Sequence, residues 1–384
     1  MNILYCSSSS YLDFDLPLLK AYGEAGHSVY FIVLIPPNGL KSTFVSISKQ
    51  YPVEGLFDYN EIYPNEFGLF KEYTGVKKLY ILNMLTNSLT FKTIKYEFQI
   101  NKLIRKYKIE INHQIGIPGI MTLPAILLRK CKKVVTVHDP VPHEHEELFK
   151  IRVMRMVILK FIKNIILLNK VQTQEFKKHY HIHNAHIYYS RLGNCETLRL
   201  YGNKIESNYR TILFYGRISQ YKGIDVLLKS FRIIEPYYND VKLVIAGRGN
   251  FSFDITQYQN DPQIEIINDF ISLDDLGSMI KSCEFAVCPY TSATQSGVVA
   301  SVLALGKPLI VTNVGGLPSM IEDGKSGIVI APNDSIQLAN EMIRLLNDRE
   351  LLESMCHYIS KSSFVGDNSW GKISQNYLRI YNSL

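Results

Sequence analysis

The strongest constraint on the fold is a regular alternation of short apolar runs and helical segments in the second half of this 384-residue chain. Runs rich in β-branched residues predict strands at 211–215, 241–246, 264–267, 285–289, 308–312 and 327–331. Helical spacing predicts helices at 223–234, 273–282, 296–305, 335–346 and 349–361. Strands that alternate with helices form parallel sheets, so we expect a doubly wound, Rossmann-like α/β domain here.

The first half of the chain begins with the same alternation. An apolar strand at 2–6 and a Ser-rich loop at 7–10 precede a helix at 12–25, and a β-branched strand follows at 27–34. This βαβ unit predicts a second parallel sheet. The rest of this half is expected to hold helices at 90–107 and 122–131 and a strand at 134–137, with no clear pattern over 40–80.

The length of the chain suggests two domains of ordinary size. We assign residues 1–195 to the first domain and 205–365 to the second. A weakly patterned stretch at about 194–209, with Gly193 and Gly202, is the expected linker. Two such domains would leave a cleft between the carboxyl ends of two sheets, where ligands of open α/β sheets bind.

Cysteine usage and hydropathy predict a cytoplasmic protein. The six cysteines are scattered without a CxxC pair, which argues against a disulfide framework and against a cysteine metal site. No apolar run is long enough to span a bilayer, and the apolar N-terminus lacks a basic leader and soon meets Asp13 and Asp15.

Positive charge gathers in the first half of the chain. Residues 1–195 carry 25 Lys and Arg against 15 Asp and Glu, a net charge of +10, whereas residues 196–384 carry 17 against 20, a net charge of −3. Either the first domain meets an anionic partner, or the whole proteome is lysine-rich. Helical spacing also predicts an arc that is either a solvated face or a patch for anionic lipid, made of Arg152, Arg155, Lys160 and Lys163.

The first chemical constellation follows the strand at 211–215. Arg217 comes directly after Gly216, and Lys222 stands five residues later at the start of the next helix. A guanidinium fork and an ammonium group can stabilise the charge on a departing nucleoside diphosphate without a metal ion. The alternative interpretation is two exposed loop cations.

A second constellation, at 293–298, follows the strand at 285–289 and opens the helix at 296–305. Small residues there allow a phosphate to approach free N–H groups at the positive end of the helix dipole. A simple N-cap is the alternative. Together with Arg217 and Lys222 in the same domain, the pattern favours a phosphate site.

The second half reads GRI…YKGIDVLL, then LVIAGRG, then CPYTSATQSGVVASVLALGKPLIVTNVGGLPSMIEDGKSG, and these strings resemble retaining GT-B glycosyltransferases of family four. The resemblance is specific over about 211–332. Before that it rests on the first βαβ unit and on VTVHD at 135–139. The tail is similar to the family's final helix, so we expect the helix at about 366–384 to return to the first domain.

The resemblance implies a GT-B fold with two Rossmann-like domains and a nucleotide-diphosphate sugar, of UDP or GDP type, as co-substrate without any other cofactor. The diphosphate would be held by Gly216, Arg217, Lys222, Ser296, Gly297 and Val298. A weaker implication places the nucleoside near Gly247, Arg248, Gly249, Phe270, Ile271 and Ser301.

From the first domain, the resemblance implies that His138 faces the donor sugar and is catalytic together with Arg217 and Lys222. A weaker implication places Ser8, Ser9, His143 and His145 on the acceptor side. The stretch HDPVPHEHE at 138–146 also carries enough imidazoles and carboxylates for zinc. Its prolines break any helix and the spacing of a helical zinc motif is absent, so we favour sugar and acceptor contacts and predict no metal.

The chain departs from the family at the residues that usually recognise the donor. The two glutamates of the family's E-x7-E pattern correspond to Ala293 and Ser301, and the acidic residue that often follows the paired glycines corresponds to Ser319. The sequence therefore leaves the donor sugar and its base open.

These features predict metal-independent sugar transfer to a glycan or lipid-linked acceptor in surface polysaccharide or glycolipid assembly. Retention at the anomeric carbon is implied by the resemblance alone. The protein would lie in the cytoplasm or peripherally on the inner face of the membrane, without a nucleic acid partner. The alternatives are a catalytically silent nucleotide-sugar-binding subunit and a GT-B enzyme that acts on a soluble acceptor.

Overall fold

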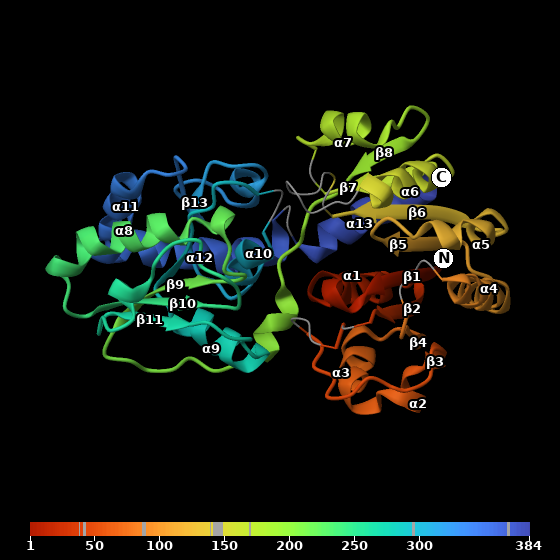
Figure 1. Ribbon diagram of the computed structural model, residues 1–384, viewed down its shortest axis with the longest axis horizontal. Helices are drawn as coiled ribbons and strands as arrows, with labels where there is room; N and C mark the ends of the chain where they lie inside the picture. The colour runs from red at the N-terminus through yellow and green to blue at the C-terminus, as the bar shows by residue number, and fades with distance from the viewer. Residues whose placement is uncertain are drawn as a thin grey trace. The chain divides into compact units, whose positions relative to one another are not determined.

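The computed structural model describes residues 1–384 except 38, 41–43, 87–89, 139, 141–148, 169, 294–295 and 367–368. The chain divides into two compact units, which Figure 1 shows with their helices and strands. Unit 1 comprises Met1–Leu192 and Trp370–Leu384, and unit 2 comprises Gly193–Ser369. Each unit has a largely parallel sheet with helices packed against it, so the predicted α/β class with two Rossmann-like domains is confirmed.

Unit 1 is built on an eight-stranded sheet with the strand order β3-β4-β2-β1-β5-β6-β7-β8. All neighbouring pairs are parallel except β3 and β4, which are antiparallel. The strands are β1 (Asn2–Ser8), β2 (Ser28–Ile35), β3 (Gly55–Asp58), β4 (Lys78–Asn83), β5 (Ile111–Ile115), β6 (Lys132–Val137), β7 (Asn164–Leu167) and β8 (His186–Tyr189). The parallel pairing of β1 with β2 confirms the predicted βαβ unit.

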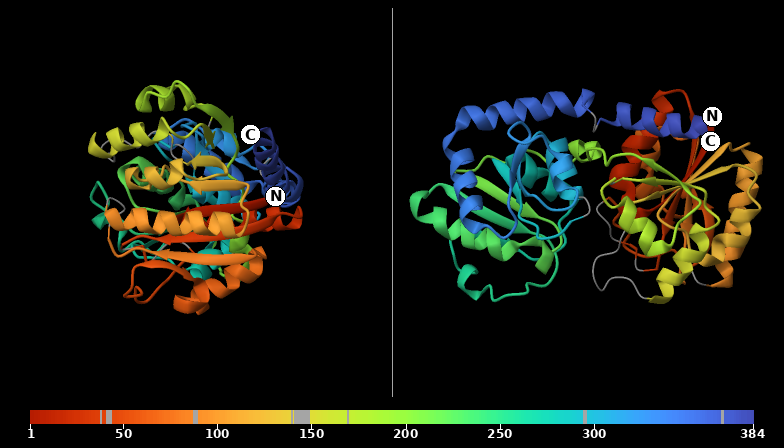
Figure 2. Two further views of the ribbon diagram at one scale, coloured as in Figure 1. Left: turned by 90° about the vertical axis from the view of Figure 1, so that its right-hand side faces the viewer. Right: turned by 90° about the horizontal axis from the view of Figure 1, so that it is seen from above.

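The helices of unit 1 pack on the two faces of this sheet. α1 (Leu12–Glu24) packs against α3 (Pro64–Thr74) and against the C-terminal helix α13 (Trp370–Ser383), which Figure 2 shows beside α1. The other helices of this unit are α2 (Tyr59–Ile62), α4 (Phe91–Lys106), α5 (Leu123–Leu127), α6 (Phe149–Leu159) and α7 (Thr173–Tyr180). Within the described part of the chain, no helix combines the length and apolar character needed to cross a membrane.

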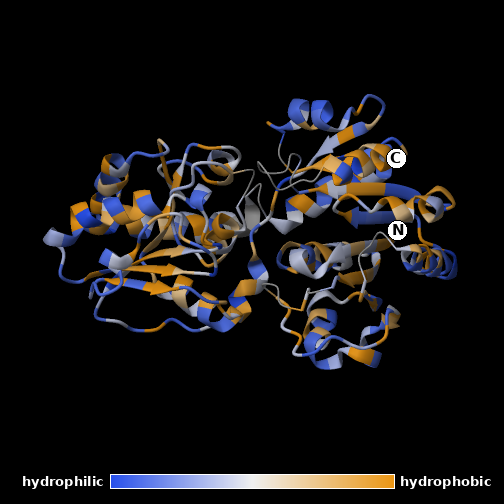
Figure 3. Cartoon of the chain, viewed as in Figure 1, coloured by the Kyte–Doolittle hydropathy of each residue, from blue (hydrophilic) through white to orange (hydrophobic). Residues whose placement is uncertain are grey.

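Unit 2 has a six-stranded parallel sheet with the order β11-β10-β9-β12-β13-β14. Its strands are β9 (Arg210–Tyr215), β10 (Val241–Ala246), β11 (Ile264–Ile267), β12 (Phe285–Cys288), β13 (Leu309–Thr312) and β14 (Gly327–Ile330). Its helices are α8 (Ile224–Ile234), α9 (Leu273–Ser282), α10 (Gly297–Ala304), α11 (Ser335–Asn347) and α12 (Arg349–Val365). These elements confirm the predicted alternation, and Figure 3 shows the hydrophobic character of the central strands.

The stretch expected as a linker is packed onto unit 2. The Cys195 side chain is buried, and its amide donates to the carbonyl oxygen of Ala300 at 3.2 Å. The Lys281 ammonium group donates to three carbonyl oxygens of the stretch, including that of Gly202 at 2.7 Å. A Cβ added at Gly202 would lie 2.3 Å from the amide nitrogen of Ser278, so this glycine serves close packing on α9 rather than flexibility.

The predicted cationic arc of four residues is wrong as a single helical face. α6 ends at Leu159, so Lys160 and Lys163 lie beyond it. The guanidinium group of Arg152 donates to the carbonyl oxygen of His179 from Nε at 3.2 Å and Nη2 at 3.1 Å, and Arg155 donates to the Tyr180 hydroxyl at 3.3 Å. Both arginines therefore bond to the end of α7, Arg152 through a carbonyl group that attracts positive charge and Arg155 through a side-chain hydroxyl.

A buried polar network ties α13 to the core of unit 1. The Tyr381 and Tyr22 hydroxyls lie 2.9 Å apart, and the Tyr381 hydroxyl lies 2.5 Å from Nδ1 of His113. Nε2 of His113 lies 2.7 Å from the Thr136 hydroxyl. Burial lowers the pKa of His113 to about 3. The neutral imidazole therefore links β5 and β6 to the C-terminal helix, because buried polar groups persist only where they find partners.

Asp15 in the same core gives the fold a testable pH dependence. Its Oδ1 accepts from the Tyr5 hydroxyl at 2.7 Å, and burial raises the pKa of Asp15 to about 7. In the unfolded chain an aspartate has a pKa of about 3.9. Between these two pKa values the folded state binds more protons than the unfolded chain does. The stability that protonated Asp15 contributes to the folded state is therefore lost as pH rises through about 7.

We expect Asp15→Asn to gain thermal stability relative to the wild type as pH rises from about 4 to about 7, and the difference to level off above that. Asparagine keeps an acceptor for Tyr5 but has no proton to lose. Melting temperatures followed by circular dichroism across this range would measure the difference. A difference that stays constant with pH would contradict the assignment.

Candidate functional site

Two glycine–arginine loops lie side by side where β9 and β10 end. The amide of Ile218 donates to the carbonyl oxygen of Arg248 at 3.1 Å. A Cβ added at Gly247 would lie 1.9 Å from the carbonyl oxygen of Gly216, so only glycine permits this approach. Arg217 and Arg248 are both exposed. The carboxyl edge of the sheet therefore carries two exposed arginines on neighbouring loops.

Asn268 is a residue of this edge that the sequence analysis missed. Its Oδ1 accepts from the amide of Gly249, and its Nδ2 donates to the carbonyl oxygen of Gly249, both at 3.1 Å. These bonds hold the loop after β11, which continues to Phe270 and Ile271, against the loop after β10. The predicted nucleoside residues at 247–249 and 270–271 thus lie on adjacent loops. The only sequence signal for Asn268 was its position just after a predicted strand.

Lys222 is a buried cation of unit 2. It ends a 3-10 helix (Gln220–Lys222) directly before α8, and only 9% of the residue is exposed. Its Nζ lies 3.7 Å from the centroid of the Tyr290 ring and 5.1 Å from that of Tyr221. No carboxylate within the described part of the chain lies within ion-pair distance of it. The interpretation of two exposed cations therefore fails for Lys222 and holds for Arg217.

Burial lowers the pKa of Lys222 to about 8, against a usual value near 10.5. The neighbouring Cys288 opposes this shift, and Arg217 adds to it. An ammonium group that has lost most of its hydration and has no carboxylate partner is poised to gain from an anion.

The first turn of α10 lies beside these loops. The Tyr215 hydroxyl donates to the carbonyl oxygen of Val298 at 3.3 Å, and a Cβ at Gly216 would lie 3.2 Å from the Val298 side chain. The Tyr290 hydroxyl lies 3.4 Å from the Ser296 hydroxyl. The structure therefore brings the predicted diphosphate residues of the two constellations together in one unit.

The N–H groups of that turn are not equivalent. The Ser296 hydroxyl caps the helix by accepting from the amide of Val299 at 3.4 Å, and the amide of Ser296 itself donates to the sulfur of Met320 at 3.4 Å. Gly297 and Val298 are the first two helical residues, whose N–H groups have no partner inside a helix. Of the predicted diphosphate residues Ser296, Gly297 and Val298, only the last two therefore present such N–H groups.

The two positions that the resemblance aligns with glutamates, Ala293 and Ser301, make contacts within unit 2. The carbonyl oxygen of Ala293 would lie 1.5 Å from a Cβ added at Gly315, and Ala293 is buried. The Ser301 hydroxyl donates to the carbonyl oxygen of Gly297 at 2.9 Å, within its own helix. Ser319 likewise donates to the carbonyl oxygen of Gly316 at 2.7 Å. The Ser301 hydroxyl thus donates within its own helix, and its nucleoside contact stays a prediction.

In unit 1, His138 follows β6 and lies beside the loop after β1. Its ring stacks on Tyr11, with centroids 4.5 Å apart and planes 22° apart, and the Phe14 ring is 6.2 Å away. The Ser8 hydroxyl accepts from the amide of Ser10 at 3.4 Å. Ser9 is buried, and its hydroxyl donates to the carbonyl oxygen of Gly39 at 3.4 Å. His138 and Ser8 thus share one edge of the sheet, whereas Ser9 is turned inward.

The remaining acceptor-side residues, His143 and His145, lie outside the described residues, as does most of the alternative zinc cluster at 138–146. Within the described part of the chain, no group of three or more His, Cys, Asp or Glu side chains is placed to hold a metal ion.

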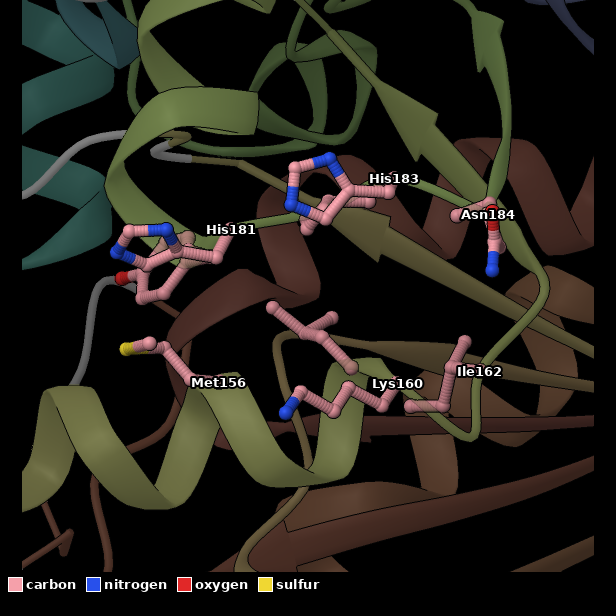
Figure 4. Close-up of a pocket in the computed structure, with 10 residues that line it drawn as sticks. Met156, Lys160, Ile162, His181, His183 and Asn184 are labelled. Carbon is pink, nitrogen blue, oxygen red and sulfur yellow. The ribbon is translucent and has the colours of Figure 1, made fainter.

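A cavity of about 230 Å³ lies between α6 and the turn from α7 to β8. Figure 4 shows Met156 and Lys160 on the α6 side, with His181 and His183 on the opposite side. The cavity is lined by none of the site residues predicted from the sequence, so it forms no part of the candidate site.

Comparison with known proteins gives a family for part of the chain. The family model described as glycosyl transferases group 1 matches residues 202–362. An uncharacterized glycosyltransferase of Methanocaldococcus jannaschii is 28% identical over 182 residues, which are 47% of this chain and 50% of that protein. The capsular polysaccharide biosynthesis glycosyltransferase CapM of Staphylococcus aureus is 27% identical over 197 residues, which are 47% of this chain and 51% of that protein. The chain thus spans about half the length of these curated relatives.

The fold also matches solved structures. HepE of Anabaena, crystallised in complex with UDP, superposes with a TM-score of 0.67 at 13% identity and with complete coverage of both chains. At this identity the likeness concerns the fold alone. The family match over 202–362, the glycosyltransferase relatives and the shared architecture of two Rossmann-like units together support a GT-B glycosyltransferase.

Proposed function

We propose that the protein transfers a sugar from a nucleoside diphosphate to a glycan or lipid-linked acceptor. The observation that carries the proposal is Lys222, a buried cation with no carboxylate partner among the described residues, close to the start of α10. Its surroundings suit a diphosphate, because an anion there would recover the electrostatic energy that the ammonium group lost on burial. The UDP complex of HepE agrees with a donor of this class.

In the proposed reaction the bond between the sugar and the diphosphate breaks while charge develops on the departing phosphate. Arg217, Lys222 and the N–H groups of Gly297 and Val298 would stabilise that charge, so the reaction requires no metal ion. The acceptor hydroxyl attacks the same face of the sugar and its proton passes to the leaving phosphate, which gives retention. No protein group is assigned as general base.

The rival proposal is a catalytically silent nucleotide-sugar-binding subunit, and it rests on Ala293 and Ser301 in place of glutamates. A second rival is an enzyme with a soluble acceptor.

A thermal-shift screen with UDP, GDP, ADP and their common sugars tests the function, since a ligand at 100 times its Kd stabilises the fold by about 2.7 kcal/mol. Hydrolysis of the donor sugar in the same samples distinguishes an enzyme from a silent binder. Absence of binding by every nucleotide would overturn the proposal.

We expect Arg217→Ala and Lys222→Met each to lower turnover by roughly 10²-fold, the scale of losing one preorganised charge donor. Methionine fills the space of the buried lysine stem. Lys229→Met, which removes an exposed lysine of α8, is the matched control and should keep wild-type turnover. Steady-state kinetics with the donor found in the screen would measure these effects, and near-normal activity in both site variants would refute the assignment. Chelation by EDTA should leave turnover unchanged.

We propose that His138 contacts the donor sugar. We expect His138→Phe to reduce sugar transfer strongly while affinity for the nucleoside diphosphate stays within about twofold, because phenylalanine keeps the stack on Tyr11 but has no polar ring atom. Transfer assays and calorimetric titration of the nucleotide would separate the two effects. Equal loss of both, with a lower melting temperature, would instead identify a structural histidine.

We further propose that unit 1 docks on the anionic inner face of the membrane, near a lipid-linked acceptor. The exposed face of α6 carries Phe149, Val153 and Val157 at a spacing of four residues, with Phe149 79% exposed. Figure 3 shows the hydrophobic character of this helix. Exposed Lys150 and Lys160 lie at its two ends. An apolar stripe with flanking lysines is typical of helices that lie in the interface of anionic lipid.

We expect the protein to sediment with liposomes that contain anionic lipid and to bind less as salt shortens the Debye length from about 10 Å at 0.1 M. The triple change Phe149→Ser, Val153→Ser and Val157→Ser should abolish binding, and Lys150→Gln with Lys160→Gln should weaken it at low salt. The control variant changes exposed Leu69 to Ser together with exposed Lys77 and Lys95 to Gln, all outside α6 and α7. If the wild type ignores anionic liposomes at low salt, the docking proposal fails.

A further inference from the structure

The Tyr290 ring lies between the buried cation and the start of α10. On one side the Lys222 ammonium group stands 3.7 Å from the ring centroid, and at its tip the hydroxyl lies 3.4 Å from the Ser296 hydroxyl that caps α10. Tyr290 itself is fully buried. One side chain thus touches both elements that the proposed function assigns to the diphosphate.

The backbone around this ring is locked. The Tyr290 carbonyl oxygen accepts from the Thr312 hydroxyl at 2.6 Å, which ties it to β13. The amide of Thr291 donates to the carbonyl oxygen of Tyr221 at 2.8 Å. A Cβ added at Gly223 would lie 2.0 Å from the carbonyl oxygen of Pro289. The segment that carries Tyr290 therefore packs directly against the segment that carries Lys222, and both side chains are buried there.

We propose that Tyr290 is a positioning residue that holds the Lys222 ammonium group, by cation–π contact, beside the first turn of α10. The inference rests on the proposed donor site. A ring face attracts a desolvated ammonium group without neutralising it, whereas a carboxylate would satisfy it. Tyr290 thus keeps the lysine charged and directed while leaving it available to an external anion. Tyr221 completes the aromatic surroundings, with its ring at 77° to that of Tyr290.

Among the residues that the structure describes, the charged and titratable neighbours of Lys222 come from three places. Arg217 approaches from the loop after β9, Cys288 from the end of β12, and the two tyrosines from their own loops. Burial raises the pKa of Tyr290 well above its usual value, so its hydroxyl stays neutral. Lys222 is then the group of this set that titrates near pH 8. Nucleotide affinity should fall as pH rises through about 8, because the neutral amine no longer attracts phosphate.

The test is calorimetric titration with UDP of Tyr290→Leu and Tyr290→Phe, each made in the wild type and in a Lys222→Met background. We expect Tyr290→Leu to lower UDP affinity roughly tenfold in the wild type and less than twofold in the Lys222→Met background, since the ring acts through the lysine. Tyr290→Phe keeps the ring face and should stay within about threefold of the wild type. It should also keep the fall in affinity near pH 8, which Lys222→Met should lose.

The matched control is Tyr258→Leu. It removes another buried tyrosine ring of unit 2, whose centroid lies 5.1 Å from the guanidinium carbon of Arg232, and it should leave UDP affinity unchanged. If Tyr290→Leu does not fold, Tyr290→Met replaces it, because methionine fills the volume flexibly and has no ring face. Equal losses in both lysine backgrounds, or a Phe variant as weak as Leu, would show a merely structural role and overturn the inference alone. A wild type that binds none of UDP, GDP or ADP would overturn the proposed function and this inference together.

Discussion

The candidate donor site depends on direct contact between backbone segments at the carboxyl edge of the unit 2 sheet. Glycine lets the loop after β10 touch the loop after β9, and another glycine lets the start of α8 touch the segment after β12. At Gly247 and Gly223 a Cβ would overlap a carbonyl oxygen, so no other residue allows the same closure. Because the loops close in this way, the side chains between them lose access to water.

Loss of water decides the chemistry of Lys222. An exposed lysine gains little from one more anion, because solvent already stabilises its charge. Lys222 lies between closed loops against two aromatic rings, and burial lowers its pKa to about 8. The ammonium group has therefore lost hydration energy, and a bound phosphate would compensate for that loss. Exposed Arg217 differs, since solvent already stabilises its charge.

Much of the fold was predictable from the sequence because the strands of unit 2 are buried on both faces and carry continuous apolar runs. β5 was missed because Asn112, His113 and Gln114 give it a polar sequence, although Asn112 and His113 are buried and hydrogen-bonded. Such partners come from distant parts of the chain, so local patterns cannot reveal them. The same limit hid the packed state of the supposed linker, whose contacts come from α9 and α10.

For the candidate site, the sequence identified the residue types but not their environments. The spacing of Arg217 and Lys222 indicated an anion site, whereas burial of the lysine by Tyr290 and the bonds of Asn268 to Gly249 required the structure. The direction of a hydroxyl is equally invisible in a sequence. Ser301 stands where the resemblance implies a nucleoside contact, but its hydroxyl bonds within α10.

The two positions that the resemblance aligns with glutamates have a structural role that bears on donor choice. Ala293 is buried and its carbonyl oxygen meets Gly315, so this position now contributes packing and not a carboxylate. A sugar hydroxyl placed there would find no charged acceptor from Ala293 or Ser301. Under the proposed function, binding energy must then come mainly from the diphosphate, through Lys222, Arg217 and the first turn of α10. Because the diphosphate is common to all such donors, the contacts of Lys222, Arg217 and α10 cannot by themselves distinguish one sugar from another, so selectivity would have to come from groups that touch the sugar itself.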